Sequence, residues 1–151
     1  MKAISLIITV VAALSLAGLS AAIAAGNSAS RPATVSTART GLGRIIVNGQ
    51  GHTLYLFEKD RRGHSACSGA CATYWPPLVT GGKPIAANGA KRALLGTIRR
   101  ADGTRQVTYA GHPVYRFLLD AKRGQTKGEG LNDFGGGWDA LTPAGKKIEG
   151  D

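Results

Sequence analysis

The longest apolar stretch of the chain comes first. It starts at Met1-Lys2, stays apolar with only scattered polar residues, and closes in small residues between Ser20 and Asn27. A short positive start, an apolar centre and a small-residue end are typical of a secretory signal peptide. We therefore predict that residues 1–25 direct export and are then removed. A retained membrane anchor is the alternative, because the stretch is long enough to span a bilayer.

A stretch without hydrophobic periodicity follows. Residues 26–42 are rich in Ser, Thr, Ala and Gly, a composition typical of flexible linkers. We expect the folded domain to occupy residues 43–151, with a first repeat at about 43–80 and a second at about 94–145.

Apolar and polar positions in the first half favour a β-hairpin. A β-branched run at 44–47 is followed by a turn with Asn-Gly chemistry and by a second run at 53–57. Period-two alternation places Tyr55 and Phe57 on one face of this strand, and Leu54 and Leu56 on the other.

In the second half, the pattern favours a three-stranded meander. Its strands are expected at 95–100, 105–109 and 114–118, and the Gly-rich segment 131–137 is expected to be a loop. Only residues 65–73 allow a short helix, and the chain contains 22 Gly. The predicted fold is therefore all-β or β-dominated.

The two halves contain the same motif. Residues 51–60 and 111–120 both read G-H-x-[LV]-Y-x-F-x-x-D, and a Trp-x-x-Leu follows each of them. Each copy alone is too small to bury a stable core. We expect the copies to pair around a pseudo-two-fold axis and to bury a shared set of aromatic side chains, namely Tyr55, Phe57, Trp75, Tyr115, Phe117 and Trp138.

The chain is strongly basic, with 19 Lys and Arg against 9 Asp and Glu and a formal net charge of +10. Such a surface attracts phosphate, anionic lipid and polyanionic envelope polymers, although basicity is also a general habit of some exported proteomes. Nucleic acid is not expected as a partner, because the protein is predicted to leave the cytoplasm and has no aromatic-rich basic motif.

Cys67 and Cys71 are the only cysteines. Two cysteines in an exported chain most often form a disulfide. A metal site with His64, and a redox-active pair, stay open as alternatives. The spacing is not the C-x-x-C of thioredoxin-like oxidoreductases, nor the C-x-x-C-H of haem attachment.

His52, His112, Asp60 and Asp120 are repeat-equivalent polar residues beside turns. We interpret both histidines as turn-stabilising, and both aspartates as acceptors of backbone N–H groups. An acid–base pair of carboxylates is the alternative. No nucleophile elbow, phosphate loop or metalloprotease motif is present in the sequence. We therefore predict no catalytic residues, no metal ligands and no cofactor.

The paired Y-x-F-x-x-D elements, together with Cys67-x-x-x-Cys71-x-x-x-Trp75-Pro-Pro, resemble a family of bacterial secreted repeats described as predicted lipoproteins. The resemblance covers roughly residues 43–145 and implies export, while the biochemical role of the family is not established. Many relatives are implied to be lipid-anchored. Here Leu16-Ala17-Gly18 is followed by Leu19 rather than Cys, so no N-terminal lipid is expected.

These observations favour a non-enzymatic structural or interaction module, either periplasmic or extracellular. The main alternative is a metal-binding or thiol-redox protein that uses Cys67 and Cys71. A hydrolase of anionic wall polymer, using Asp60 and Asp120, is a third hypothesis.

Overall fold

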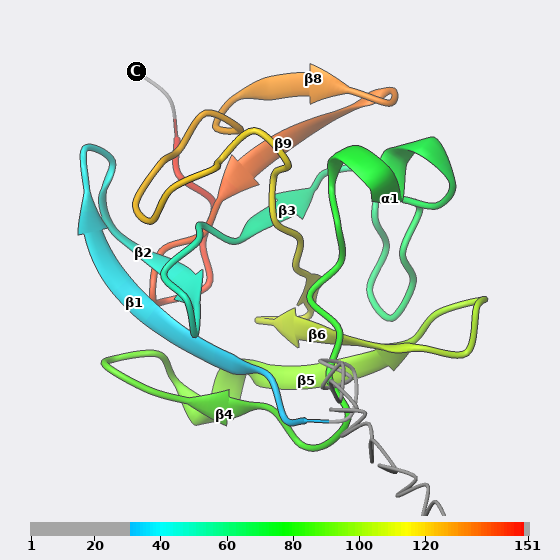
Figure 1. Cartoon of the computed structure of the whole chain (residues 1–151), viewed down its shortest axis with the longest axis horizontal. Helices are drawn as coiled ribbons and strands as arrows, with labels where there is room; N and C mark the ends of the chain where they lie inside the picture. Colours follow the sequence, from blue (N-terminus) through cyan, green and yellow to red (C-terminus); the bar gives the residue numbers. More distant parts are fainter. Residues whose placement is uncertain (1–30, 150–151) are drawn as a thin grey trace, which may run out of the picture.

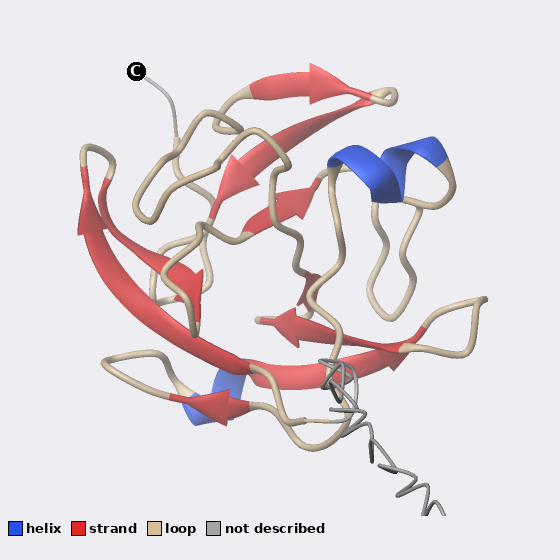
Figure 2. Cartoon of the chain, viewed as in Figure 1, coloured by secondary structure: helices blue, strands red, loops and turns tan. Residues whose placement is uncertain are grey.

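Strands dominate the computed structural model, which describes residues 31–149 (Figures 1 and 2). In this described part of the chain, nine strands form three sheets of three strands each. The predicted β-dominated fold is confirmed. The predicted signal peptide, residues 1–25, lies outside the described residues.

The first sheet corrects the predicted linker. β1 (Thr34–Thr40) pairs antiparallel with β2 (Gly43–Asn48) and, at its start, parallel with β4 (Ile85–Ala86). Residues 34–40 are therefore a strand, and the flexible-linker prediction is wrong there. The Ser and Thr content suggested a linker, but β-branched Thr also favours strands, and Val35 is fully buried.

The second sheet joins the two halves. β3 (Tyr55–Phe57), from the first half, pairs antiparallel with β9 (Gly136–Ala140), which pairs with β8 (Leu131–Asp133). The expected loop at 131–137 is thus mostly a β-hairpin. Glycine concealed its strands, because it contributes no apolar periodicity. Yet Gly136 and Gly137 provide the space into which Phe57 and Glu58 pack.

The third sheet is the predicted meander. β5 (Leu95–Arg99), β6 (Arg105–Tyr109) and β7 (His112–Pro113) follow one another as antiparallel neighbours. The last strand was expected at 114–118 but lies at His112–Pro113 instead. Beyond Pro113 the backbone turns to meet the first half, where Tyr115 bridges to both Tyr55 and Pro77.

Between residues 31 and 149, helical structure is limited to two short segments, α1 (Ala70–Tyr74) and the 3-10 turn η2 (Arg92–Leu94). α1 lies at the end of the predicted window 65–73. It begins only at Ala70 because the positive φ of Gly69, 58°, is not helical. Ser65 and Cys67 are held instead by hydrogen bonds to Tyr115 and Arg100.

Alternating side chains of the strands fill two separate cores. Tyr55 and Phe57 belong to one cluster, together with Trp75, Tyr115 and Trp138. Leu54 and Leu56 lie in the other cluster, against residues such as Val107, Tyr109 and Val114. The period-two pattern therefore assigned these faces correctly.

Four rings of the first cluster form one stack in which the two halves alternate. Phe57 stacks on Trp138 with ring centroids 4.1 Å apart, and Trp138 stacks on Trp75 at 3.9 Å. Trp75 in turn stacks on Phe117 at 4.3 Å. Tyr55 meets Trp75 edge-on, and Tyr115 meets Trp138 in the same way. The interior is thus shared between the repeats and closely follows their pseudo-two-fold relationship.

Candidate functional site

The two motif tyrosines lie at the centre of the molecule. The backbone N–H of Tyr55 donates to the carbonyl of Tyr115 at 2.8 Å, and that of Tyr115 donates back to Tyr55 at 3.0 Å. Each side chain then crosses to the other repeat. Tyr55 Oη donates to Asp120 Oδ2 at 2.6 Å, and Tyr115 Oη donates to Asp60 Oδ2 at 2.7 Å.

Each aspartate also closes the loop that follows it. Asp60 Oδ1 accepts the backbone N–H of Ala66 at 2.6 Å, and Asp120 Oδ1 accepts that of Lys127 at 2.9 Å. Burial raises the pKa of both carboxyl groups above the ordinary value of 3.8, and the donated hydrogen bonds only partly oppose this. Burial also raises the pKa of both tyrosines. The four groups thus join repeats and brace loops.

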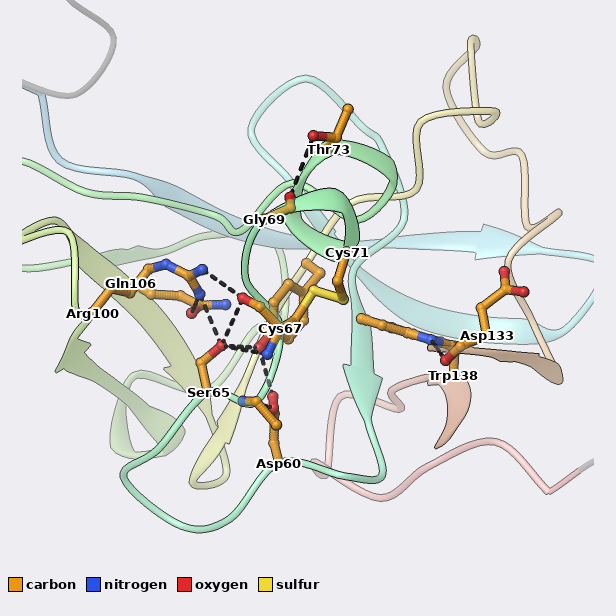
Figure 3. Close-up of a disulfide and its surroundings, with 12 residues drawn as sticks. Asp60, Ser65, Cys67, Gly69, Cys71, Thr73, Arg100, Gln106, Asp133 and Trp138 are labelled. Carbon is orange, nitrogen blue, oxygen red and sulfur yellow. Dashed lines mark hydrogen bonds between the residues drawn. A yellow bond between two sulfur atoms is a disulfide. The ribbon is translucent and has the colours of Figure 1, made fainter. Parts of the chain in front are cut away.

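An arginine that the sequence analysis missed extends one of these pairs (Figure 3). Arg100 Nη1 donates to Ser65 Oγ at 2.9 Å and to Gln106 Oε1 at 2.7 Å, while Nη2 donates to the Cys67 carbonyl at 2.6 Å. Ser65 Oγ lies 2.7 Å from Tyr115 Oη. Because the hydroxyl hydrogen of Tyr115 goes to Asp60, Ser65 is the donor of that bond. No sequence pattern marks Arg100, since its second-half position has no counterpart in the motif.

Cys67 and Cys71 form a disulfide that spans the start of α1. Both residues are buried, in the cluster that also contains Trp138 (Figure 3). Each sulfur is bonded to the other, so neither is a thiolate in this state. Within residues 31–149, no group of three or more His, Cys, Asp or Glu side chains is arranged to hold a metal ion; His64 does not complete a site with the cysteines.

The two repeat histidines have different surroundings. His52 Nδ1 lies 3.1 Å from the backbone carbonyl of Asp120. His112 lines a hollow of about 120 Å³ together with Asp60 and Arg62. Burial, together with the charge of Arg62, lowers the pKa of His112. Asp60 and Asp120 do not share this hollow, so the structure does not assemble the acid–base constellation.

A larger cleft of about 500 Å³ lies beside the N-terminal segment. Arg31 and Arg116 provide its cationic groups, His52 adds an imidazole, and none of its lining residues is acidic. Its walls come from residues 31–34, the turn after β2, and the segment 77–79 that follows Trp75. This cleft has the volume typical of ligand sites, about 300–1,000 Å³, whereas the hollow at His112 is smaller.

A duplicated β unit with a shared aromatic interior and crossed Tyr–Asp pairs defines a two-repeat β protein. The chain belongs to the family described as secreted repeat of unknown function, whose model matches residues 36–79 and 96–142. The family resemblance expected from the motifs is confirmed, and the first match begins within β1. Membership in a secreted family makes this an exported protein.

Comparison with curated proteins and with solved structures found no match. Between residues 31 and 149, no helix has the length and apolar character needed to cross a membrane.

Proposed function

We propose that the protein is a non-enzymatic interaction module of the cell envelope, periplasmic or extracellular, which binds polyanionic envelope polymer in the cleft of Arg31, His52 and Arg116. The observation that carries this proposal is the composition of the cleft, which combines three basic side chains with no acidic one. Guanidinium groups bind phosphate and carboxylate oxygens in pairs, through a fixed fork of N–H donors.

The remaining charge of the chain supports the same partner. The excess of basic over acidic residues extends beyond the cleft, and such a field concentrates anionic ligands near the surface. A polymer with repeated anionic groups benefits most, because it contacts the cleft and the surrounding surface together.

The motif residues favour binding over catalysis. Each motif aspartate accepts a tyrosine hydroxyl and a backbone N–H, and the four stacked rings are buried. These side chains hold the two repeats together, which makes the domain a rigid support for its surface. The thiol-redox alternative gains no support from Cys67 and Cys71, which are 0% and 5% exposed.

Titration calorimetry with long-chain inorganic polyphosphate tests the proposal. Loss of one charge-assisted contact in Arg116→Ala or Arg31→Ala is expected to weaken binding roughly tenfold. Arg39→Ala is the matched control, because it removes the same charge from an exposed position of β1 outside the cleft. Equal weakening in all three variants, or no binding by the unmodified protein, would overturn the cleft as the site.

A further inference from the structure

Large hydrophobic side chains gather on one part of the surface. Of the five exposed ones in residues 31–149, four are Tyr74, Leu118, Leu119 and Phe134, which we call the apolar patch; each is between 41% and 57% exposed. The rings of Tyr74 and Phe134 have centroids 6.0 Å apart, and the N–H of Leu118 donates to the carbonyl of Tyr74 at 2.9 Å. In Figure 1, the end of the β8–β9 hairpin lies near α1.

Phe134 occupies its position against a backbone penalty. It forms the turn between β8 and β9 with φ of 56°, the left-handed region that suits glycine and asparagine and disfavours bulky side chains. The side chain is 41% exposed, so a large part of the ring is not buried within the domain. A strained and exposed aromatic residue at a hairpin tip points to a role outside the fold.

The two repeats differ at the turn that follows the motif phenylalanine, Phe57 in the first copy and Phe117 in the second. In the first copy, the corner that follows Phe57 is Glu58-Lys59, and the N–H of Glu58 donates to the carbonyl of Gly137. In the second copy, the corner after Phe117 is Leu118-Leu119, whose first N–H donates to Tyr74. The turn therefore forms with charged corner residues, and the fold itself does not require leucines there.

Cations border the apolar patch. Arg116 precedes Leu118 by two residues, and the N–H groups of both donate to the segment 74–76, so the two side chains lie on the same side of this backbone. Arg116 also lines the cationic cleft. On the other side, Lys59 Nζ lies 3.4 Å from the position that a Cβ atom on Gly135 would occupy. Exposed aromatic and aliphatic side chains flanked by Lys and Arg are the arrangement that binds an anionic membrane interface.

We propose that the apolar patch docks the exported domain on an anionic lipid bilayer, with Phe134, Leu118 and Leu119 entering the headgroup region and Arg116 and Lys59 facing lipid phosphates. A second copy of the chain fits less well, because both copies carry a large positive charge and repel each other. This site shares Arg116 with the polymer-binding cleft, but none of its hydrophobic residues lines that cleft.

Co-sedimentation with vesicles tests the proposal. The exported protein is mixed with vesicles of phosphatidylglycerol and phosphatidylcholine in equal parts, and separately with phosphatidylcholine alone. Binding to the anionic vesicles is expected to exceed binding to the neutral ones. In Phe134→Gly, the bilayer loses the ring that enters its headgroup region, and vesicle binding should weaken roughly tenfold. The midpoint of thermal unfolding should stay the same or rise, because glycine tolerates this backbone conformation.

Leu118→Glu/Leu119→Lys, which gives the second copy the corner residues of the first, should weaken vesicle binding as well. Ile85→Ser, on β4, removes an exposed hydrophobic side chain outside the apolar patch and should bind as the unmodified protein does. Unchanged binding in Phe134→Gly would overturn the proposal. So would a self-association of the free protein that Phe134→Gly abolishes, since that result would assign the patch to a second copy. Polyphosphate binding by Phe134→Gly should be unaffected, which separates this proposal from that of the cleft.

Discussion

Two tyrosine hydroxyls connect the repeats of this protein at the level of single residues. Tyr55 reaches Asp120 and Tyr115 reaches Asp60, so each motif contains one half of two different contacts. The sequence identified all four residues, and it indicated that the aspartates accept backbone N–H groups. It did not indicate the crossing, because a motif records which residues recur and not which copy they contact.

Removing one hydroxyl should destabilise the fold measurably. In Tyr115→Phe, the half-buried carboxyl of Asp60 loses a donor, which costs about 1 kcal/mol. Chemical denaturation measures this loss in the free energy of unfolding. Tyr74→Phe serves as the control, because Tyr74 is half exposed. A Tyr115→Phe protein as stable as the unmodified one would show that this hydrogen bond makes no net contribution.

The raised pKa of Asp60 predicts a pH dependence of stability with a defined sign. Because the folded-state pKa lies above 3.8, the folded state binds the proton more tightly. The contribution of Asp60 to stability is therefore greatest below pH 3.8 and is lost as the pH rises through the folded-state pKa. His112 acts in the opposite direction, since its lowered pKa costs stability as the pH falls below 6.5.

Comparing the protein with Asp60→Asn isolates the aspartate from His112, which both proteins share. The free energy of unfolding, measured across the acidic range, should change so that the unmodified protein becomes more stable relative to Asp60→Asn as the pH falls. A difference that does not vary with pH would contradict the raised pKa.

At the level of elements, one of the three sheets is built from strands of both halves. The predicted hairpin of 44–47 with 53–57 is reduced to one bridge between Val47 and Thr53. β2 pairs with β1 instead, and β3 pairs with β9 of the second half. Strand residues with strong periodicity, as in β2, β5 and β6, were predictable. β1 and the β8–β9 hairpin were not predictable, because segments rich in Ser, Thr and Gly have the composition of linkers. Only the pairing with a partner strand makes them strands.

The disulfide constrains one short segment, and its removal should be tolerated. Cys67→Ala/Cys71→Ala opens a loop of only a few residues, for which chain entropy predicts a loss of about 2 kcal/mol. Arg100 and Asp60 continue to hold the same segment through the Cys67 carbonyl and the Ala66 N–H. Denaturation followed by tryptophan fluorescence should show a folded protein with a lower midpoint. Complete unfolding of this variant would show that the disulfide is essential to the fold.

At the scale of the whole molecule, the alternating ring stack makes the halves interdependent. Trp138 lies between Phe57 and Trp75 of the other half, so neither repeat has an interior of its own. Folding is expected to be a single cooperative transition, as is usual for small domains.

Trp138→Ala tests this interdependence. The loss of a buried indole costs about 3–5 kcal/mol, and Trp75, then the only tryptophan, reports on the first half. Its fluorescence and the far-UV circular dichroism should change together, at a midpoint below that of the unmodified protein. Tyr74→Ala, which removes an aromatic ring from a half-exposed position, is the control. Two separate transitions would indicate that the halves fold independently.

The sequence by itself determined the β-dominated class, the duplication, the faces of the central strands and membership in a secreted family, because periodicity and repeated motifs are local properties of the chain. Tertiary structure alone decided the crossed Tyr–Asp pairs, the exchange of strands, the role of Arg100, and the positions of the cationic cleft and the apolar patch. These features join residues distant along the chain, such as Arg31 with Arg116, or Tyr74 with Phe134. Their proximity depends on how the two repeats pack, which no local pattern records.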